Sequence, residues 1–78
     1  MEFDDAEGLS LALDAFLRGL SKEARVFFVQ RYWMSYSIAE VASQNSVSEG
    51  KVKMSLLRTR RLLRKFLDER DGEYEVAG

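Results

Sequence analysis

The stretch KVKMSLLRTRRLLRK, residues 51–65, combines a helical repeat of apolar side chains with a high density of positive charge. It holds seven Lys or Arg residues and no acid. A solvated helix usually interleaves Glu with Lys, so this excess of cations favours a helix that binds a polyanion. The inward face is predicted from side chains that recur at helical spacing, namely Val52, Leu56, Thr59, Leu63 and Phe66.

The residues before this basic helix predict a helix-turn-helix. Residues 37–40 have the pattern S-x-x-E of a capping box, which predicts a short third helix that begins at Ser37 and ends at Gln44. Residues 45–48 then form a turn in which Val47 is the buried residue, and Ser48 caps the basic helix. A short helix, a tight turn and a longer basic helix are the order found in DNA-binding motifs of this kind.

Two further helices are expected upstream. The first has one apolar stripe and ends near residues 19–20; the stripe consists of Leu9, Leu13, Phe16, Leu17 and Leu20. Ser21 caps the second helix, which runs from Lys22 to about Tyr32. In that helix we expect Arg25 and Arg31 to point outward. We expect the core to hold Ala24 and the aromatic side chains Phe27, Phe28, Tyr32 and Trp33. With no strand pattern, the sequence predicts an all-α, compact four-helix domain.

Charge is segregated along the chain, although the formal net charge is only -1. Residues 1–14 contain five acids and no base, and residues 68–78 contain five acids and one Arg. Residues 15–67 contain eleven bases and three acids. We therefore predict an acidic mobile head at residues 1–8, a DNA-binding domain at residues 9–70 and a frayed acidic tail at residues 71–78. The basic helix should end at about Arg70.

The composition argues against an enzyme. The chain has no Cys and no His, which excludes thiolate nucleophiles, imidazole bases and the usual zinc ligands. Its carboxylates cluster at the ends, and no Gly-rich phosphate loop is present. We expect no catalytic residue, no metal and no cofactor. No apolar run approaches the roughly 20 residues of a membrane span, and the acidic start is unlike a signal peptide, so we expect a cytoplasmic protein.

The face of the basic helix opposite its apolar stripe supplies the candidate DNA contacts. Residues near its N-terminus would approach base edges, and those further along would approach phosphates. The candidates for base readout are Lys51, Lys53, Met54, Ser55, Leu57 and Arg58. The candidates for phosphate contact are Ser48, Gly50, Arg60, Arg61, Arg64 and Lys65. Glu49 is better explained by the helix dipole than by a cytosine contact.

From Leu13 to Leu67 the chain resembles region 4 of bacterial sigma factors of the sigma-70 family, most closely the extracytoplasmic-function group. The resemblance is carried by an ordered set of short motifs rather than by any one of them. They are Leu20-Ser21, Arg31-Tyr32, Ser37, Glu40-Val41-Ala42, Ser48-Glu49-Gly50-Lys51-Val52-Lys53 and Arg58-Thr59-Arg60.

The resemblance implies binding of the promoter -35 element in the major groove by the fourth helix, together with docking on core RNA polymerase. Family base-contacting positions fall on Lys53, Met54, Ser55, Leu57 and Arg58. An apolar surface of the earlier helices would hold a polymerase helix, the flap tip, with Trp33, Met34 and Tyr36 at its rim. An inhibitory anti-sigma factor and a bacterial cytoplasmic location are also implied.

The chain departs from the family pattern in its recognition helix and its turn. Lys51 replaces the usual Thr, Met54 a small Ser and Ser55 a frequent Arg, so no relative's target sequence can be transferred. Asn45 stands where an apolar residue is common, and Ser46 where Gly is common. Two alternatives follow for the turn: a looser conformation, or a left-handed backbone at Asn45.

Three functional classes remain open from the sequence. The first is promoter recognition in transcription initiation, either as a fragment of a longer sigma factor or as a stand-alone protein. The second is the helix-turn-helix domain of a response regulator or repressor. The third is a protein-interaction module whose basic helix is masked by an acidic segment or by a partner. The Arg31-Tyr32 pair and the R-x-R motif favour the first.

Overall fold

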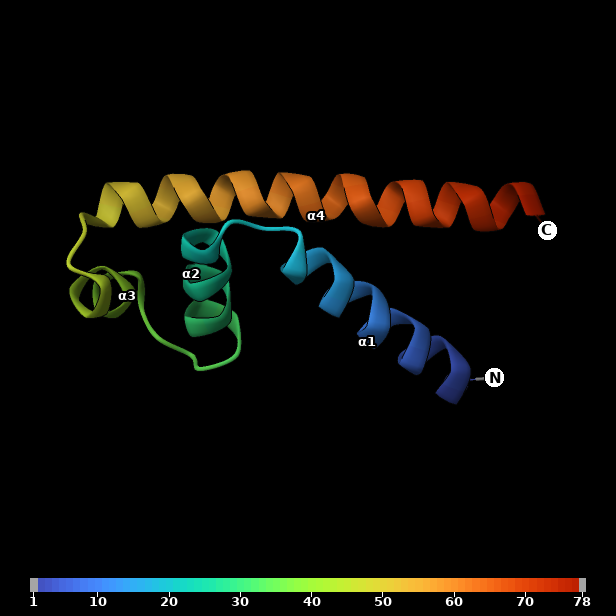
Figure 1. Cartoon of the computed structure of the whole chain (residues 1–78), viewed down its shortest axis with the longest axis horizontal. Helices are drawn as coiled ribbons and strands as arrows, with labels where there is room; N and C mark the ends of the chain where they lie inside the picture. Colours follow the sequence, from blue (N-terminus) through green and yellow to red (C-terminus); the bar gives the residue numbers. More distant parts are fainter. Residues whose placement is uncertain (1, 78) are drawn as a thin grey trace.

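The computed structural model describes the backbone of residues 2–77 and the side chains of residues 10–69. The backbone forms four helices and, over those residues, no strand (Figure 1). Their bounds are α1 (Glu2–Arg18), α2 (Lys22–Tyr32), α3 (Ile38–Asn45) and α4 (Glu49–Ala77). The prediction of an all-α four-helix domain containing a helix-turn-helix is confirmed.

The core lies where α2 and α3 pack against the first half of α4. Phe27 of α2, Val41 and Ala42 of α3, and Val52 and Leu56 of α4 form one buried cluster. Phe27, Val41 and Val52 are fully buried, so the helix-turn-helix is fixed by side chains from three helices. The predicted inward face of α4 is confirmed. It consists of buried Val52, Leu56 and Thr59, followed by half-buried Leu63 and Phe66.

Helix α1 contacts α4 through Phe16 and diverges from the core toward its N-terminus (Figure 1). Phe16 is buried, and its ring lies 5.5 Å from the ring of Phe66 on α4, measured between centroids. Leu11, one and a half turns earlier, is 72% exposed. Because α1 and the second half of α4 both extend past the core, the molecule measures 46 × 21 × 17 Å.

Local capping explains where α2 and α3 begin. The Ser21 hydroxyl accepts a hydrogen bond from the Ala24 N–H at 3.2 Å. At the start of α3 the predicted capping box is present: Ser37 Oγ accepts from the Glu40 N–H at 3.0 Å, and Glu40 Oε1 accepts from the Ser37 N–H at 2.9 Å. Both starts therefore satisfy backbone donors that a helix leaves free.

Two predicted helix limits are corrected. Helix α4 continues to Ala77 instead of ending at about Arg70, and α1 begins at Glu2 instead of after residue 8. Neither end carries a proline or a glycine pair that would stop a helix. The Leu9 side chain lies outside the described ones. The mobility of the acidic head and tail stays a prediction.

The predicted burial of four aromatic residues is right for two and wrong for two. Phe27 and Phe28 are buried, whereas Tyr32 is 46% and Trp33 65% exposed. Helix α2 ends at Tyr32, so the last aromatic residues follow the chain out of the core. The Tyr32 ring still packs against Phe28, with centroids 4.9 Å apart.

The prediction that Arg31 points outward is wrong. Its guanidinium donates to the Tyr36 carbonyl at 3.1 Å and lies 5.9 Å from the centre of the Tyr32 ring. The side chain is half-buried because it closes the connection between α2 and α3. A positively charged residue here satisfies a backbone acceptor where the chain turns.

Candidate nucleic-acid interface

The turn before α4 is held by hydrogen bonds rather than being loose. Ser46, not Asn45, adopts the left-handed conformation, with φ 55° and ψ 45°. Asn45 is instead the last residue of α3, and its side-chain amide donates to Gln30 Oε1 at 2.7 Å and to the Val41 carbonyl at 2.8 Å. Both alternatives drawn from the sequence are therefore wrong. Asn45 connects the turn to α2.

Val47 fills the turn as predicted. Its side chain packs against the core cluster, and its N–H donates to the Ala42 carbonyl at 3.0 Å. The Ser48 hydroxyl accepts from the Lys51 N–H at 3.1 Å, which fixes the first turn of α4. These contacts set the direction in which α4 leaves the turn.

Gly50 lies exposed in that first turn, and the protein itself does not require a glycine there. A Cβ built at Gly50 would meet Ser48 Oγ at 3.9 Å, an ordinary contact distance. The proposed close approach of a phosphate to Gly50 stays a prediction. Ser48, the other phosphate candidate in this turn, is also exposed, but its hydroxyl is used in capping.

The candidates for base readout do not share one face. Lys51, Lys53, Met54 and Arg58 are exposed, whereas Ser55 and Leu57 are half-buried. With roughly 100° of rotation per residue, Lys53 and Ser55 lie about 160° apart around α4. Lys53 faces a hollow shared with Arg31 and Ile38, and Ser55 faces the start of α2. Met54 and Arg58 lie between these flanks, pointing away from the core.

The cations further along α4 are exposed: Arg60, Arg61, Arg64 and Lys65. The ion pairs recorded among the described side chains join Arg18 to Asp14 within α1 and Lys51 to Glu23 between α4 and α2. The cations of residues 53–65 take part in neither pair. They form a positive surface of about three helical turns, long enough to follow a DNA backbone.

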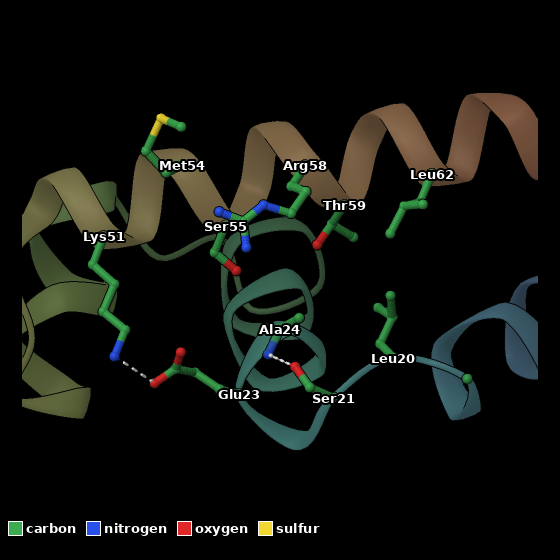
Figure 2. Close-up of a pocket in the computed structure, with 11 residues that line it drawn as sticks. Leu20, Ser21, Glu23, Ala24, Lys51, Met54, Ser55, Arg58, Thr59 and Leu62 are labelled. Carbon is green, nitrogen blue, oxygen red and sulfur yellow. Dashed lines mark hydrogen bonds and ion pairs between the residues drawn. The ribbon is translucent and has the colours of Figure 1, made fainter.

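A groove separates one flank of this surface from the start of α2 (Figure 2). Its volume is about 340 Å³. Figure 2 shows the Lys51 side chain crossing the groove to Glu23, with Nζ 3.1 Å from Oε2. The sequence interpretation missed Glu23 as a functional candidate, because 28 positions separate it from Lys51 and only the packing of α2 on α4 brings them together.

A second, apolar groove lies on the other side of α4. Its volume is about 660 Å³, and its lining consists of Leu13, Phe28, Tyr32, Trp33, Arg60 and Leu63. Of the three residues predicted at the rim of an apolar surface, Trp33 and Met34 are 65% and 52% exposed, and of these two Trp33 lines the groove. Tyr36 is half-buried and packs against the core, because it follows the loop inward. The apolar surface is therefore centred on Trp33.

None of the helices, over the part of the chain that the structure describes, combines the length and apolar character of a membrane span. The family model of sigma-70 region 4 matches residues 10–63 of the chain. The search of curated proteins gave no match to the chain. The matched range covers the second half of α1, then α2, α3, the turn and the first half of α4, and it includes the core cluster and the lining of both grooves.

Proposed function

Because the chain belongs to the sigma-70 region 4 family, we propose that α4 binds the promoter -35 element in the major groove while α1 and α2 dock on core RNA polymerase. The family consists of DNA-binding domains that act in transcription initiation, and it is not a family of enzymes. Of the three classes left open by the sequence, the family match supports the first.

The observation that carries the DNA part of this proposal is the orientation of α4. Val52, Leu56 and Thr59 are buried, so the opposite face of the same turns is directed to solvent. That face presents Met54 and Arg58, with Lys53 on one flank, at the end of α4 that follows the turn. A major groove admits one α-helix, and the N-terminal residues of a recognition helix contact base edges.

The side chains on this face suit two kinds of contact. Arg58 can donate two parallel hydrogen bonds to guanine, and Met54, which is 55% exposed, can contact a thymine methyl group. Arg61, Arg64 and Lys65 follow along the same helix and suit phosphates. Because each phosphate contact releases condensed cations, the proposed binding weakens steeply with salt.

The polymerase part of the proposal rests on the apolar groove. Exposed aromatic side chains that line a concave apolar surface are typical of protein interfaces, and Trp is enriched among residues that contribute most to binding. Trp33 is 65% exposed at this groove, and Arg60 adds one positive charge to its edge. We propose that an apolar segment of the polymerase flap occupies it. An anti-sigma factor would compete there or on α4.

Selection from a pool of random duplexes, with and without core RNA polymerase, tests the function. We expect one sequence motif to be enriched when polymerase is present. Its affinity should fall roughly a thousandfold between 50 and 200 mM salt if about six phosphates are contacted. Enrichment of no motif under either condition would contradict promoter recognition. A flat salt response would instead favour a protein-interaction module.

A matched pair of variants separates the two proposed surfaces. Arg58→Ala should reduce DNA binding and leave polymerase binding to the isolated chain unchanged. Trp33→Ala should do the reverse. The two residues lie on different sides of α4, in the lining of different grooves. Loss of both activities in either variant, with an unchanged thermal melt, would contradict the assignment of separate surfaces.

A further inference from the structure

The ion pair between Lys51 and Glu23 spans the groove beside the proposed base-contacting face of α4 (Figure 2). Both side chains are half exposed, at 52% for Lys51 and 50% for Glu23. The other ion pair of the described side chains lies within α1, so this one is the pair that joins two helices of the candidate interface. Because exposed ion pairs contribute little to stability, we ask what this pair does at the interface.

Both partners stand on helix starts that are fixed by caps. Glu23 lies two residues after Ser21, which caps α2, and Lys51 lies three residues after Ser48, which caps α4. The core cluster holds these two helices together through Phe27, Val52 and Leu56. The ammonium and the carboxylate are therefore presented from a rigid frame.

The pair changes what Lys51 can bind. An ammonium has three donors, and the pair with Glu23 occupies one of them. The Glu23 carboxylate also places a negative charge beside the groove, which disfavours an approaching phosphate. A base edge has no net charge and is not repelled in this way. Guanine presents two neighbouring acceptors in the major groove, O6 and N7, and its partner cytosine presents an amino donor.

We propose that Glu23 is a positioning residue for DNA recognition, which holds Lys51 toward the edge of a G·C base pair and away from phosphates. This inference rests on the proposed function, since it concerns the same DNA interface. The donors left on Lys51 suit the O6 and N7 acceptors of guanine, and the negative charge of the nearby Glu23 carboxylate favours a base pair that also presents the amino donor of cytosine. Specificity at this base pair therefore depends on both residues, although only Lys51 touches the base.

Four variants test the proposal on the duplex selected together with core RNA polymerase: Glu23→Gln, Lys51→Met, the double variant and Asp14→Asn. Asp14→Asn is the matched control, because it also removes one acid from an exposed ion pair, 3.0 Å from Arg18 on α1, away from the groove. Affinity is measured for the parent duplex and for each single base-pair change, at two salt concentrations. Thermal melts verify that every variant is folded.

We expect Glu23→Gln to lose about tenfold of the discrimination at one G·C pair. It should also steepen the dependence of log K on log salt by about one unit, because a freed Lys51 turns to a phosphate. Lys51→Met should lose discrimination at the same base pair, and the double variant should lose no more than Lys51→Met does. Asp14→Asn should keep the parent's base preferences and salt dependence.

Two results would overturn the inference. If Glu23→Gln behaved like Asp14→Asn, with the parent's discrimination at every base pair, Glu23 would have no part in base recognition, and the proposed promoter function would stand. If the parent itself discriminated among no duplexes, the proposed function and this inference would fail together. The first result and the second are distinguished by the parent's own measurements.

Discussion

The two halves of this molecule differ in how completely their apolar side chains are buried. In the helix-turn-helix half, apolar side chains such as Val41 and Val52 are fully buried, and the helix starts are capped by Ser37 and Ser48. In the half formed by α1 and the end of α2, Leu11 and Trp33 are largely exposed. The first half satisfies its own packing, whereas the second leaves apolar area exposed, and around Trp33 this area lines a groove that a partner would cover.

This contrast explains how a chain of 78 residues could bind the two proposed partners, DNA and polymerase. A polyanion needs an exposed, positively charged and rigid surface, and a completed core supplies the rigidity. A protein partner needs exposed apolar area. A small domain has few apolar side chains, so it can provide this area only by leaving some of them outside its own core. Five variants, ordered from the largest expected effect to the smallest, test the contrast.

The largest effect is expected at the centre of the helix-turn-helix half, where the core is fully packed. Val52→Asp places a charge at a fully buried position, so the domain should lose more than about 4 kcal/mol of stability and unfold. Circular dichroism should show no cooperative melt. Lys53→Asp, at the exposed neighbouring position, is the control and should melt like the parent. A cooperative melt for Val52→Asp equal to the parent's would contradict the described core.

The next largest effect is expected in the half formed by α1 and the end of α2. Trp33→Ala should weaken binding to core RNA polymerase by about 2 to 4 kcal/mol, as expected for a central aromatic residue of an interface. The melting temperature should change little, because the side chain is 65% exposed. Leu11→Ala, equally apolar and exposed but outside the lining of the groove, is the control for binding. Equal effects of the two changes would argue against a defined docking site.

On the DNA side we expect a smaller effect. Arg58→Ala should cost about 1 to 3 kcal/mol of binding free energy on the selected duplex and relax one base preference. Arg64→Ala, two turns further along α4, should weaken binding to all duplexes about equally. Titrations against single base-pair variants of the duplex distinguish the two patterns. A uniform loss for Arg58→Ala would reassign this residue to a phosphate.

A stabilising change is expected in the turn. Ser46 has a positive φ of 55°, which costs a non-glycine residue free energy, so Ser46→Gly should stabilise the domain by up to about 1 kcal/mol. Ser43→Gly, the same change inside α3, should destabilise it by a similar amount. Thermal melts of both variants give the comparison. A loss of stability in Ser46→Gly would show that the left-handed residue carries no strain.

The smallest effect concerns the cap of α3. Hydrogen bonds from the Ser37 backbone N–H, and then from its side chain, lower the pKa of the Glu40 carboxyl. A lowered folded-state pKa means that this stabilisation is complete above the ordinary carboxyl pKa of about 4.3 and is lost as pH falls through the folded-state value. The melting temperature of Glu40→Gln should therefore approach that of the parent as pH decreases from about 6 to about 3. A constant difference would mean that the charge plays no part in the cap.

Sequence reasoning succeeded where structure depends on neighbouring residues. The caps at Ser21, Ser37 and Ser48 follow from local patterns, and they are present. The buried face of α4 follows from helical periodicity, so Val52 and Leu56 were placed correctly. These features use information contained within a few residues of the chain.

The predictions that were wrong concern features that depend on how the helices and loops pack against one another. Exposure of Tyr32 and Trp33 depends on where α2 ends relative to α1, and the roles of Asn45 and Arg31 depend on groups across a loop or on another helix. The pair of Lys51 with Glu23 has the same origin, since its partners lie on different helices. Which face of α4 a base would meet was therefore only partly predictable.

Helix α4 runs without interruption from the turn at Ser48, past the groove with Glu23, to the apolar groove that Arg60 lines. A straight helix of this kind behaves as a lever, since it has no proline at which to bend. Any tilt imposed at one end appears as a displacement at the other. Under the proposed function, a promoter whose spacing is wrong by one base pair would thus strain the contact with polymerase, and the domain would measure distance as well as sequence.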